Sequence, residues 1–282
     1  MIARLAFDHV LAAAGTLSAA PQILVGLSEL LRDPQVELDR VCEQVKLDPA
    51  LAAAVVRVSN SVMFGFGGRV ASVEEAVSRV GLSEVMRLVG VATVGRLVDR
   101  ALPGHAIRAD ELRRSLVLHA LAAEQLALRC GVEPRLAYTA GLLRAIGIMV
   151  LERVMATDGF EVQPFDPESF ASYQDWEIAH VGMTHEEAAV IAFEGWRCAP
   201  ELVEAVRAQA KFVGAHDDSR LAGVINLAGA GLVRAGRALP GDEMFWTLTD
   251  AKLAALGLDE PAWTHAMEVA AAMFAKVRGG LF

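Results

Sequence analysis

Apolar residues recur along almost the whole chain with the spacing of amphipathic α-helices. One apolar face is formed by Ile23, Leu24, Leu27, Leu30 and Leu31. These positions follow the i, i+1, i+4, i+7, i+8 pattern, which places them on one side of a helix. No segment alternates apolar and polar residues over the length of a strand. The pattern therefore predicts an all-α fold built from many helices.

Polar residues mark where several of these helices should begin. Asp48 precedes Pro49, a pair typical of a helix start because Asp can accept hydrogen bonds from free amides and proline has no amide to leave unpaired. The segments 72–75 (Ser-Val-Glu-Glu) and 184–187 (Thr-His-Glu-Glu) have the spacing of capping boxes. We expect Asp110 to cap a further helix.

The longer patterns suggest how the chain is organised. Pro103-Gly104 is the clearest internal break. We expect one continuous helix over Leu136–Arg153, followed by the longest loop over Asp158–Phe170, which is interrupted by glycine and prolines. The sequence predicts three helical parts of one continuous globular unit, namely residues 1–103, 104–215 and 216–282.

Composition narrows the class of protein. Hydrophobic residues make up 54% and aromatic residues only 6% of the 282 residues, so the core is built from helix-favouring Ala and Leu together with Val. A formal charge of -9 argues against general nucleic-acid binding, which needs a dense basic surface. The three cysteines form no CxxC pair, which favours buried thiols in a reducing cytosol. Polar residues interrupt the apolar run Val10–Leu31, so we expect a cytoplasmic protein without a membrane span or secretory signal.

The histidines form no recognisable metal motif. None of the seven pairs as HxH or HxxxH, and His185-Glu186 begins like the zinc-protease motif HExxH but has Ala189 at the second histidine position. His119 lies on an apolar helical face, where a hydrogen-bonded core role is favoured over a ligand role. The glycine-rich run 65–68 lacks the Lys-Ser/Thr of a phosphate-binding loop, so we interpret it as a turn. No GxSxG nucleophile motif is present.

The segment Gly141–Gly147 resembles the core motif of metal-dependent HD phosphohydrolases, in which a helix carries Gly-Leu-Leu-His-Asp-Ile-Gly. In this chain Arg144-Ala145 stands at the His-Asp position. Alanine has no donor atom and arginine keeps its proton, so neither residue can bind a cation. The resemblance implies a metal-binding scaffold that has lost its ligands.

Further segments resemble the HDOD family, the non-catalytic relatives of the HD superfamily. The likeness is carried by Asp48-Pro49-Ala50-Leu51, Arg57-Val58-Ser59-Asn60-Ser61, Phe64-Gly65, Ser72–Gly81, Arg114-Ser115-Leu116, Gly182-Met183-Thr184-His185, and Trp196 with Pro200. Together these segments cover about residues 15–215 of the sequence. The resemblance implies a multi-helix fold in which an N-terminal helical part packs on an HD-like helical core.

The resemblance also implies that the other metal positions are altered. The first ligand position aligns best with Arg114, and His119 would replace it only if the helix register shifted. Gln209-Ala210 stands where a His-His pair would be, which leaves His185 as the surviving histidine. A single histidine makes a poor transition-metal site, so we expect no metal and no cofactor. The degenerate metal positions are Arg114, Arg144, Ala145, Gln209 and Ala210.

The leading hypothesis is therefore a stand-alone, non-enzymatic bacterial signalling module that acts by binding signalling proteins or a small anionic ligand. We expect a cleft between the N-terminal helices and the HD-like half, lined or flanked by Asn60, Arg144, His185 and Gln209. Arg144 could bind the phosphate or carboxylate of a ligand. The alternative, which we favour, is an ion pair with an internal Asp or Glu, because a partly buried arginine usually finds a carboxylate.

Two rival hypotheses stay open at this point. The first is a phosphohydrolase or phosphodiesterase whose metal site has been rebuilt from His119, His180, His185 and acidic residues. The second is a nucleotide-binding receptor without turnover. Metal content and binding of nucleotides distinguish the three hypotheses.

Overall fold

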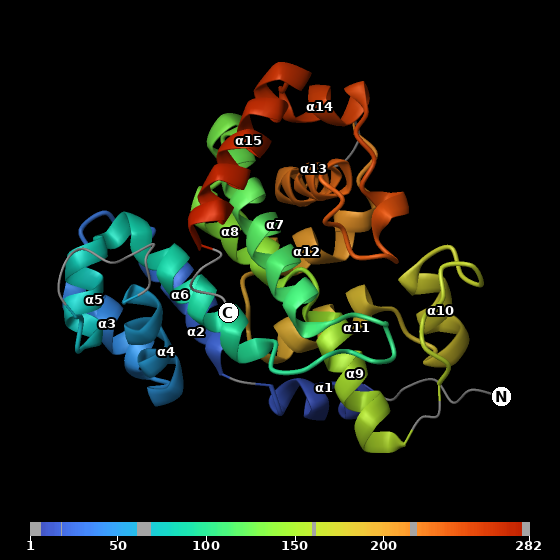
Figure 1. Ribbon diagram of the computed structural model, residues 1–282, viewed down its shortest axis with the longest axis horizontal. Coiled ribbons are helices and arrows are strands. Elements are labelled where there is room, and N and C mark those ends of the chain that lie inside the picture. Colours follow the sequence, from blue (N-terminus) through green and yellow to red (C-terminus); the bar gives the residue numbers. More distant parts are fainter. Residues whose placement is uncertain (1–6, 18, 61–68, 160–161, 215–218, 278–282) are drawn as a thin grey trace.

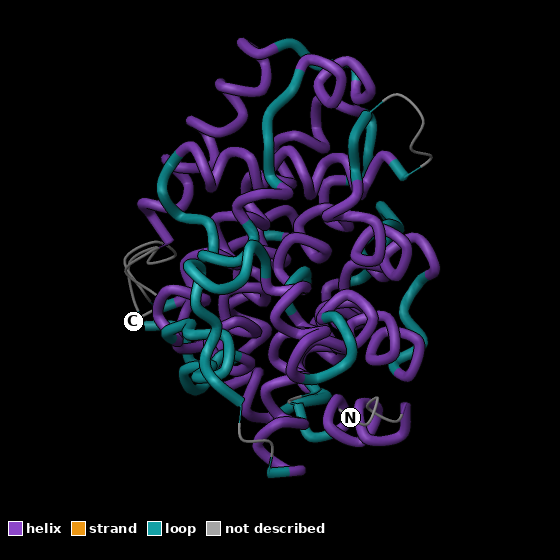
Figure 2. Tube along the Cα trace, turned by 90° about the vertical axis from the view of Figure 1, so that its right-hand side faces the viewer, coloured by secondary structure: helices purple, strands orange, loops and turns teal. Residues whose placement is uncertain are grey.

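The computed structural model describes residues 7–17, 19–60, 69–159, 162–214 and 219–277. Within these ranges the protein is 71% helical and has no strand, which confirms the predicted all-α class (Figure 2). The helices are α1 (Phe7–Gly15), α2 (Ala20–Leu30), α3 (Leu38–Lys46), α4 (Pro49–Ser59), α5 (Val73–Val80), α6 (Leu82–Leu97), α7 (Ala109–Cys130), α8 (Pro134–Leu143), α9 (Ile146–Asp158), α10 (Tyr173–His180), α11 (His185–Gly195), α12 (Pro200–Ala208), η1 (Gln209–Lys211), α13 (Arg220–Arg234), η2 (Glu243–Phe245), α14 (Asp250–Leu256) and α15 (Glu260–Val277).

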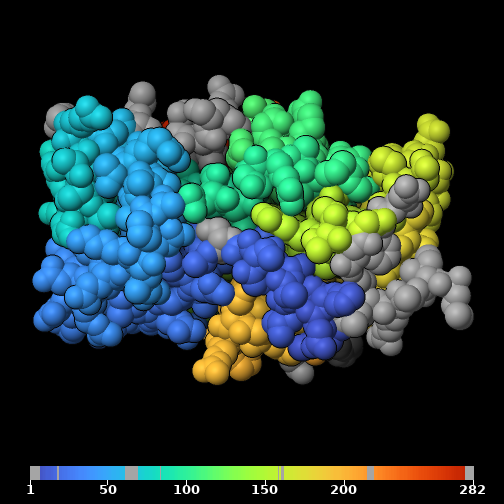
Figure 3. All heavy atoms as spheres, turned by 90° about the horizontal axis from the view of Figure 1, so that it is seen from below, coloured from blue at the N-terminus to red at the C-terminus, as the bar shows by residue number. Residues whose placement is uncertain are grey.

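The N-terminal helices form a separate end of the molecule (Figure 1). Helix α6 packs against α2 and α4, and α3 packs against α5. Helix α1 does not join this group, because it packs against α9 and α11 of the second half. Figure 3 shows this crossing from below, with the dark blue N-terminal helix lying beside the yellow-green segment of α9. The first helix thus ties the two halves together.

The long helix α7 is the centre of the second half (Figure 1). It contacts α8, and it also contacts α13 and α15 from the C-terminal segment. The buried apolar side chains of all three predicted parts form one hydrophobic cluster that extends from Val10 to Ala270. The C-terminal segment is therefore part of the same core and covers one side of α7.

Several helix boundaries follow the polar residues that the sequence singled out. The Asp48 carboxylate accepts hydrogen bonds from the amides of Ala50 and Leu51, and the Thr184 capping box is complete. The expected cap at Asp110 is wrong. Helix α7 begins one residue after Arg108, so Asp110 lies inside its first turn, where its negative charge still favours the helix dipole.

The expected continuous helix over residues 136–153 is also wrong. The chain turns at Arg144-Ala145, which separates α8 from α9. Arg and Ala both favour helices, so local propensity gives no sign of this break. Tertiary contacts decide it: the Gln209 side chain donates to the Arg144 carbonyl at 3.2 Å, and α9 passes directly against α11. Residues 162–170 lie outside the helices, as expected for the predicted loop, whereas Asp158 is still the last residue of α9. Helix α10 then begins at Tyr173 without having been predicted.

None of the described helices is by itself both long enough and apolar enough to cross a membrane. Helices α1 and α2 reach the required length and apolar content only when taken together, and their axes differ by 81°.

Candidate functional site

Arg144 stands where the HD motif, which the segment Gly141–Gly147 resembles, has its histidine, and it is almost fully buried, with 3% of its surface exposed. Its Nη1 donates to Asp242 Oδ2 at 2.7 Å, and its Nη2 donates to Ser115 Oγ at 3.3 Å. The Trp246 ring lies against the guanidinium, 5.4 Å from the Arg144 Cζ. Of the two alternatives for Arg144, the structure shows the internal carboxylate. Asp242 lies 98 residues further along the chain, which is why sequence proximity could not identify it.

The backbone around this ion pair is held by buried polar side chains. The Asn226 Nδ2 donates to the Gln209 carbonyl at 2.7 Å, and the Gln209 Nε2 donates to the Arg144 carbonyl. Lys252 Nζ, also buried, donates to Asn226 Oδ1 at 2.8 Å and to the Thr247 carbonyl at 2.9 Å. Burial lowers the pKa of Lys252. The C-terminal segment therefore surrounds the backbone at Arg144 and Gln209 with its own polar groups.

His119, the alternative for the first ligand position, lies beside the same ion pair. Its Nε2 donates to the Ile225 carbonyl at 2.9 Å, and its ring packs edge-on against Trp246. Burial, together with the nearby Arg144 charge, lowers the pKa of His119 well below its ordinary value. The ring is therefore neutral and faces a fixed cation, an arrangement that opposes metal binding at its other nitrogen.

The remaining expected site residues lie in different places. Arg114 is partly exposed on α7 and pairs with Asp110 at 3.6 Å. Asn60 ends α4 and clips the chain to Val70, accepting from its amide at 2.8 Å and donating to its carbonyl at 2.9 Å. Of the four expected cleft residues, the structure brings only Arg144 and Gln209 into contact. The glycine-rich run 65–68 lies outside the described residues.

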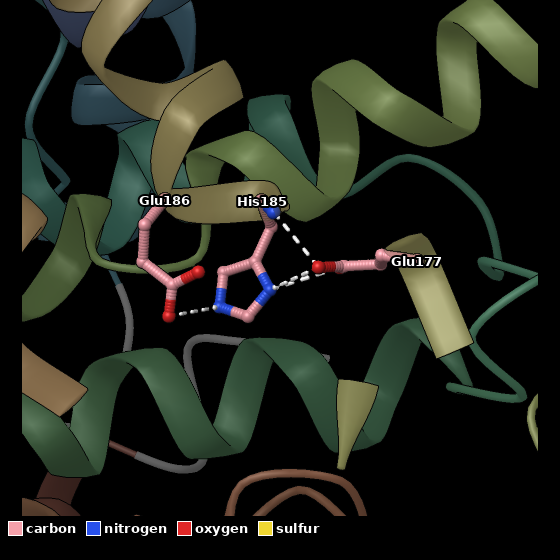
Figure 4. A group of neighbouring side chains, drawn as sticks. All are labelled: Glu177, His185 and Glu186. Carbon is pink, nitrogen blue, oxygen red and sulfur yellow. Dashed lines mark hydrogen bonds and ion pairs between the residues drawn. The ribbon is translucent and has the colours of Figure 1, made fainter. Parts of the chain in front are cut away.

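His185 belongs to a second buried polar cluster, at the start of α11 (Figure 4). Its Nδ1 contacts both carboxylate oxygens of Glu177, at 2.8 and 2.9 Å, and its backbone amide donates to Glu177 Oε2 at 2.8 Å. Its Nε2 lies 3.2 Å from Glu186 Oε1. Both ring nitrogens therefore face carboxylates, which is the pairing expected of an imidazolium.

The cluster continues through a second histidine that the sequence did not single out. His105 Nε2 lies 2.9 Å from Glu177 Oε1, and His105 Nδ1 lies 2.8 Å from Glu152 Oε1. We call the set Glu152, His105, Glu177, His185 and Glu186 the carboxylate–histidine chain. Two histidines thus share the carboxylate of Glu177, which is fully buried.

In the carboxylate–histidine chain, the carboxylates raise the pKa values of the histidines, and the histidines lower the pKa values of Glu177 and Glu186. Burial alone would lower the pKa of His185, but Glu177 and Glu186 outweigh it and hold that pKa well above its ordinary value. The pKa of His105 is raised against burial by Glu152 and Glu177 in the same way. Conversely, the two histidines outweigh the effect of burial on Glu177 and lower its pKa, and His185 lowers the pKa of Glu186 to about 2.

Glu177, His185 and Glu186 have the spacing of possible metal ligands, because one donor atom from each lies within 4.8 Å of the others. Each ring nitrogen of His185 already faces a carboxylate at hydrogen-bonding distance (Figure 4). A protonated imidazole offers no lone pair, so a cation would have to displace a proton and break a contact on one side of the ring. The arrangement fits a buried charge network better than a metal centre.

An open groove of about 700 Å³ lies beside Glu186 of the carboxylate–histidine chain. It is lined by Gln174, Met183, Thr184, Glu186, Glu187, Val190, Ile191, Arg207, Ala210, Lys211 and Phe245. We call it the α11 groove. One part of its wall comes from α10, α11 and the turn between them, and the other part comes from α12, η1 and η2. None of the four expected cleft residues lines it, and of the degenerate metal positions only Ala210 does.

Comparison with known proteins identifies the family. The model of the HDOD domain matches residues 17–212, more than half of the chain, so this protein belongs to the HDOD family. A curated relative, an uncharacterized protein of Treponema pallidum (strain Nichols), is 29% identical over 79 residues. The match spans 28% of this chain but only 15% of that protein.

Solved structures show the same fold. A candidate phosphohydrolase from Shewanella amazonensis SB2B superposes with a TM-score of 0.65 at 20% identity, covering 97% of this chain and 98% of its own. An HDOD domain protein of unknown function from Geobacter sulfurreducens gives 0.65 at 18% identity over 98% and 99%. A candidate signal transduction protein from Marinobacter aquaeolei VT8 gives 0.69 at 24% identity, covering 96% of this chain and 64% of its own. At such coverage the shared fold includes helices beyond residue 212.

Sequence reasoning missed several residues that complete the two clusters. Asp242 and Trp246 follow α13 in a stretch that has no motif, and no local signal marks them as partners of Arg144. Glu177 lies on α10, which was not expected as a helix. Its signal was present in Ser172, which caps α10 by accepting from the amide of Asp175. A serine three residues before an acidic residue is a known helix-start pattern.

Proposed function

We propose that this protein is a non-enzymatic regulatory module that acts by binding. The observation that carries the proposal is the buried Arg144–Asp242 ion pair, 2.7 Å long. Arg144 stands at the His-Asp position of the HD motif that this segment resembles. The pair supplies a fixed positive charge together with its own counter-charge. A metal cation at this place would be repelled by the Arg144 guanidinium, and the Asp242 carboxylate is already engaged by Arg144.

A phosphohydrolase is the second candidate, since three donor atoms of the carboxylate–histidine chain lie close together. The three histidines of the rebuilt metal site do not converge, however. His119 bonds to the Ile225 carbonyl, His180 Nδ1 lies 2.9 Å from the Trp176 carbonyl, and His185 lies between Glu177 and Glu186. These contacts favour the regulatory function.

The partners follow from the same proposal. We expect a cytoplasmic protein that contacts signalling proteins or takes a small anionic ligand such as a nucleotide. General nucleic-acid binding is disfavoured by the charge of -9. Any ligand would act by shifting the balance between helix arrangements rather than by being turned over.

The test is hydrolysis by the untagged protein. Purified chain is incubated with a phosphodiester such as bis(p-nitrophenyl) phosphate, and with cyclic dinucleotides, in the presence of Mn²⁺, Fe²⁺ or Mg²⁺. We expect no product above the rate with metal alone. Metal-dependent turnover that co-elutes with the protein, and that is lost in a folded His185→Gln variant, would show that the protein is an enzyme.

A further inference from the structure

The size of the α11 groove suits a small molecule. Its volume of about 700 Å³ lies in the range of small-molecule sites, about 300–1,000 Å³. Its lining combines the apolar side chains of Met183, Val190, Ile191 and Phe245 with charged residues from two sets of helices. A mostly apolar cavity with a few placed polar groups is the common form of a ligand site.

The charged residues of the α11 groove are divided between its walls. Arg207 and Lys211 lie on the wall formed by α12 and η1. The contacts of Arg207 with Glu194 and Glu204, at 3.6 and 3.7 Å, are longer than a charge-assisted hydrogen bond. Lys211 is exposed and makes no side-chain hydrogen bond or ion pair with the described part of the chain. This wall can therefore still bind an anion.

The part of the wall formed by α10 and α11 offers no free positive charge, and its carboxylates already have partners. Glu186 is bonded to His185 and Gln174, and Glu187 is used by the Thr184 capping box, so both carboxylates are already engaged. Their negative charge nevertheless repels a second anionic group. The Gln174 Nε2 donates to Glu186 at 2.6 Å, which leaves the Gln174 Oε1 as a buried acceptor without a described partner. This wall therefore calls for a hydrogen-bond donor.

We infer that the α11 groove binds an amphipathic small molecule with one anionic group at Arg207 and Lys211, an apolar body in the middle, and an N–H or O–H donor at Gln174. This inference rests on the proposed function, because it supplies the ligand of a binding module. The volume and the single basic wall favour one anion on a small apolar body over a protein surface, which would cover a far larger area.

The α11 groove lies next to both buried clusters, so its occupancy can reach the rest of the fold. Phe245 follows Asp242 by three residues, and its carbonyl accepts from Asn226 Nδ2 at 3.2 Å. Ala210 follows Gln209, whose side chain holds the Arg144 carbonyl. Glu186 ends the carboxylate–histidine chain. A ligand that moves either wall therefore acts on groups that are bonded to Arg144 or to His185.

Matched probe molecules test the inference in the full chain. Indole-3-acetate has the three required features, tryptamine exchanges the anion for a cation, and 1-benzothiophene-3-acetate lacks the N–H donor. We expect indole-3-acetate to bind with a Kd of about 1 mM or tighter. Tryptamine should bind at least about tenfold more weakly, and the benzothiophene several-fold more weakly, by calorimetry or ligand-observed NMR.

Two surface variants supply the control. Lys211→Glu places a third carboxylate in the groove and should weaken indole-3-acetate at least about tenfold. Lys276→Glu makes the same change on the exposed face of α15 and should leave binding unchanged. The inference is overturned if indole-3-acetate does not bind, if tryptamine binds equally well, or if Lys211→Glu has no effect. None of these outcomes bears on hydrolysis, so failure here is distinct from failure of the proposed function.

Discussion

Arg144 brings a positive charge into an interior that is closed to water, and Asp242 is the residue that makes this possible. Removing water from two charges is costly, and their attraction offsets the cost only when the geometry is good. The distance of 2.7 Å and the additional contact with Ser115 meet that condition. The buried guanidinium of Arg144 therefore has its own carboxylate partner, Asp242.

Asp242→Ala should destabilise the protein by about 3–5 kcal/mol, because it leaves Arg144 buried without a counter-charge. The double variant Arg144→Met, Asp242→Leu should cost clearly less than Asp242→Ala alone, since no charge is left behind. Urea unfolding followed by circular dichroism measures both. As a control, Glu260→Ala removes a partner of Arg234 on the surface and should change stability very little. Equal losses in Asp242→Ala and Glu260→Ala would speak against a buried ion pair.

The raised pKa values of His185 and His105 make the stability of the fold depend on pH. Their pKa values are raised in the folded state, so their contribution is full below the ordinary value near 6.5 and is lost as pH rises through the folded values. We expect the free energy of unfolding to fall as the pH rises above about 6.5, by up to about 1.4 kcal/mol per pH unit for each histidine.

The variant His185→Gln checks the origin of this slope. It removes one of the two titrating groups and should make the decline with pH shallower, whatever it does to stability at pH 6.5. The pKa of His119 is lowered, so this residue acts at acidic pH. Its effect is that stability falls as the pH drops below the ordinary histidine pKa near 6.5. A stability curve that rises as the pH increases above about 6.5 would contradict the assignment of charged histidines.

At the scale of elements, the two glycines of the motif Gly141–Gly147 act as contact points between helices. A Cβ atom on Gly141 would lie 2.7 Å from the Ala120 Cα in α7. A Cβ atom on Gly147 would lie 1.7 Å from the His185 carbonyl oxygen in α11. The frame of the motif is therefore explained by close helix packing, which does not require a metal.

Gly147→Ala should destabilise the protein by about 3 kcal/mol or more, because α9 and α11 would have to move apart. Gly95→Ala is the matched control, since a Cβ atom there meets nothing within 4 Å in the exposed face of α6. It should be neutral or stabilising by up to about 1 kcal/mol, as expected for Ala over Gly in a helix. Thermal unfolding of both variants tests the prediction, and similar midpoints would contradict it.

The helices themselves could largely be predicted, whereas the contacts between them could not. Apolar periodicity and caps such as Asp48 and Thr184 act within a few residues, so they located α2, α4 and α11. The break at Arg144-Ala145 depends on Gln209, 65 residues away. The role of Arg144 depended on Asp242, 98 residues away, so sequence reasoning could only state the alternatives. His105 follows a Pro-Gly turn, and nothing local indicates that it faces two carboxylates.

At the scale of the whole molecule, the C-terminal segment completes a fold whose family match ends at residue 212. Helix α13 is buried along most of its length and supplies Asn226, and the segment that follows supplies Asp242. We therefore expect a chain ending at residue 215 to lose cooperative unfolding, because Arg144 and one side of α7 would face water. Near-ultraviolet circular dichroism and urea titration measure this. A truncated chain that unfolds as sharply as the full chain would show that the C-terminal segment is an accessory.

The Arg144–Asp242 ion pair and the carboxylate–histidine chain engage Arg144 and His185 in buried contacts with carboxylates. We propose that these contacts take the place of a catalytic metal. The most direct test is the metal content of protein purified without a histidine tag. We predict that Mn, Fe and Zn are far below one ion per chain after purification, and that the content does not change in a folded His185→Ala variant. About one bound ion per chain that disappears in His185→Ala would contradict it and would identify a rebuilt metal centre.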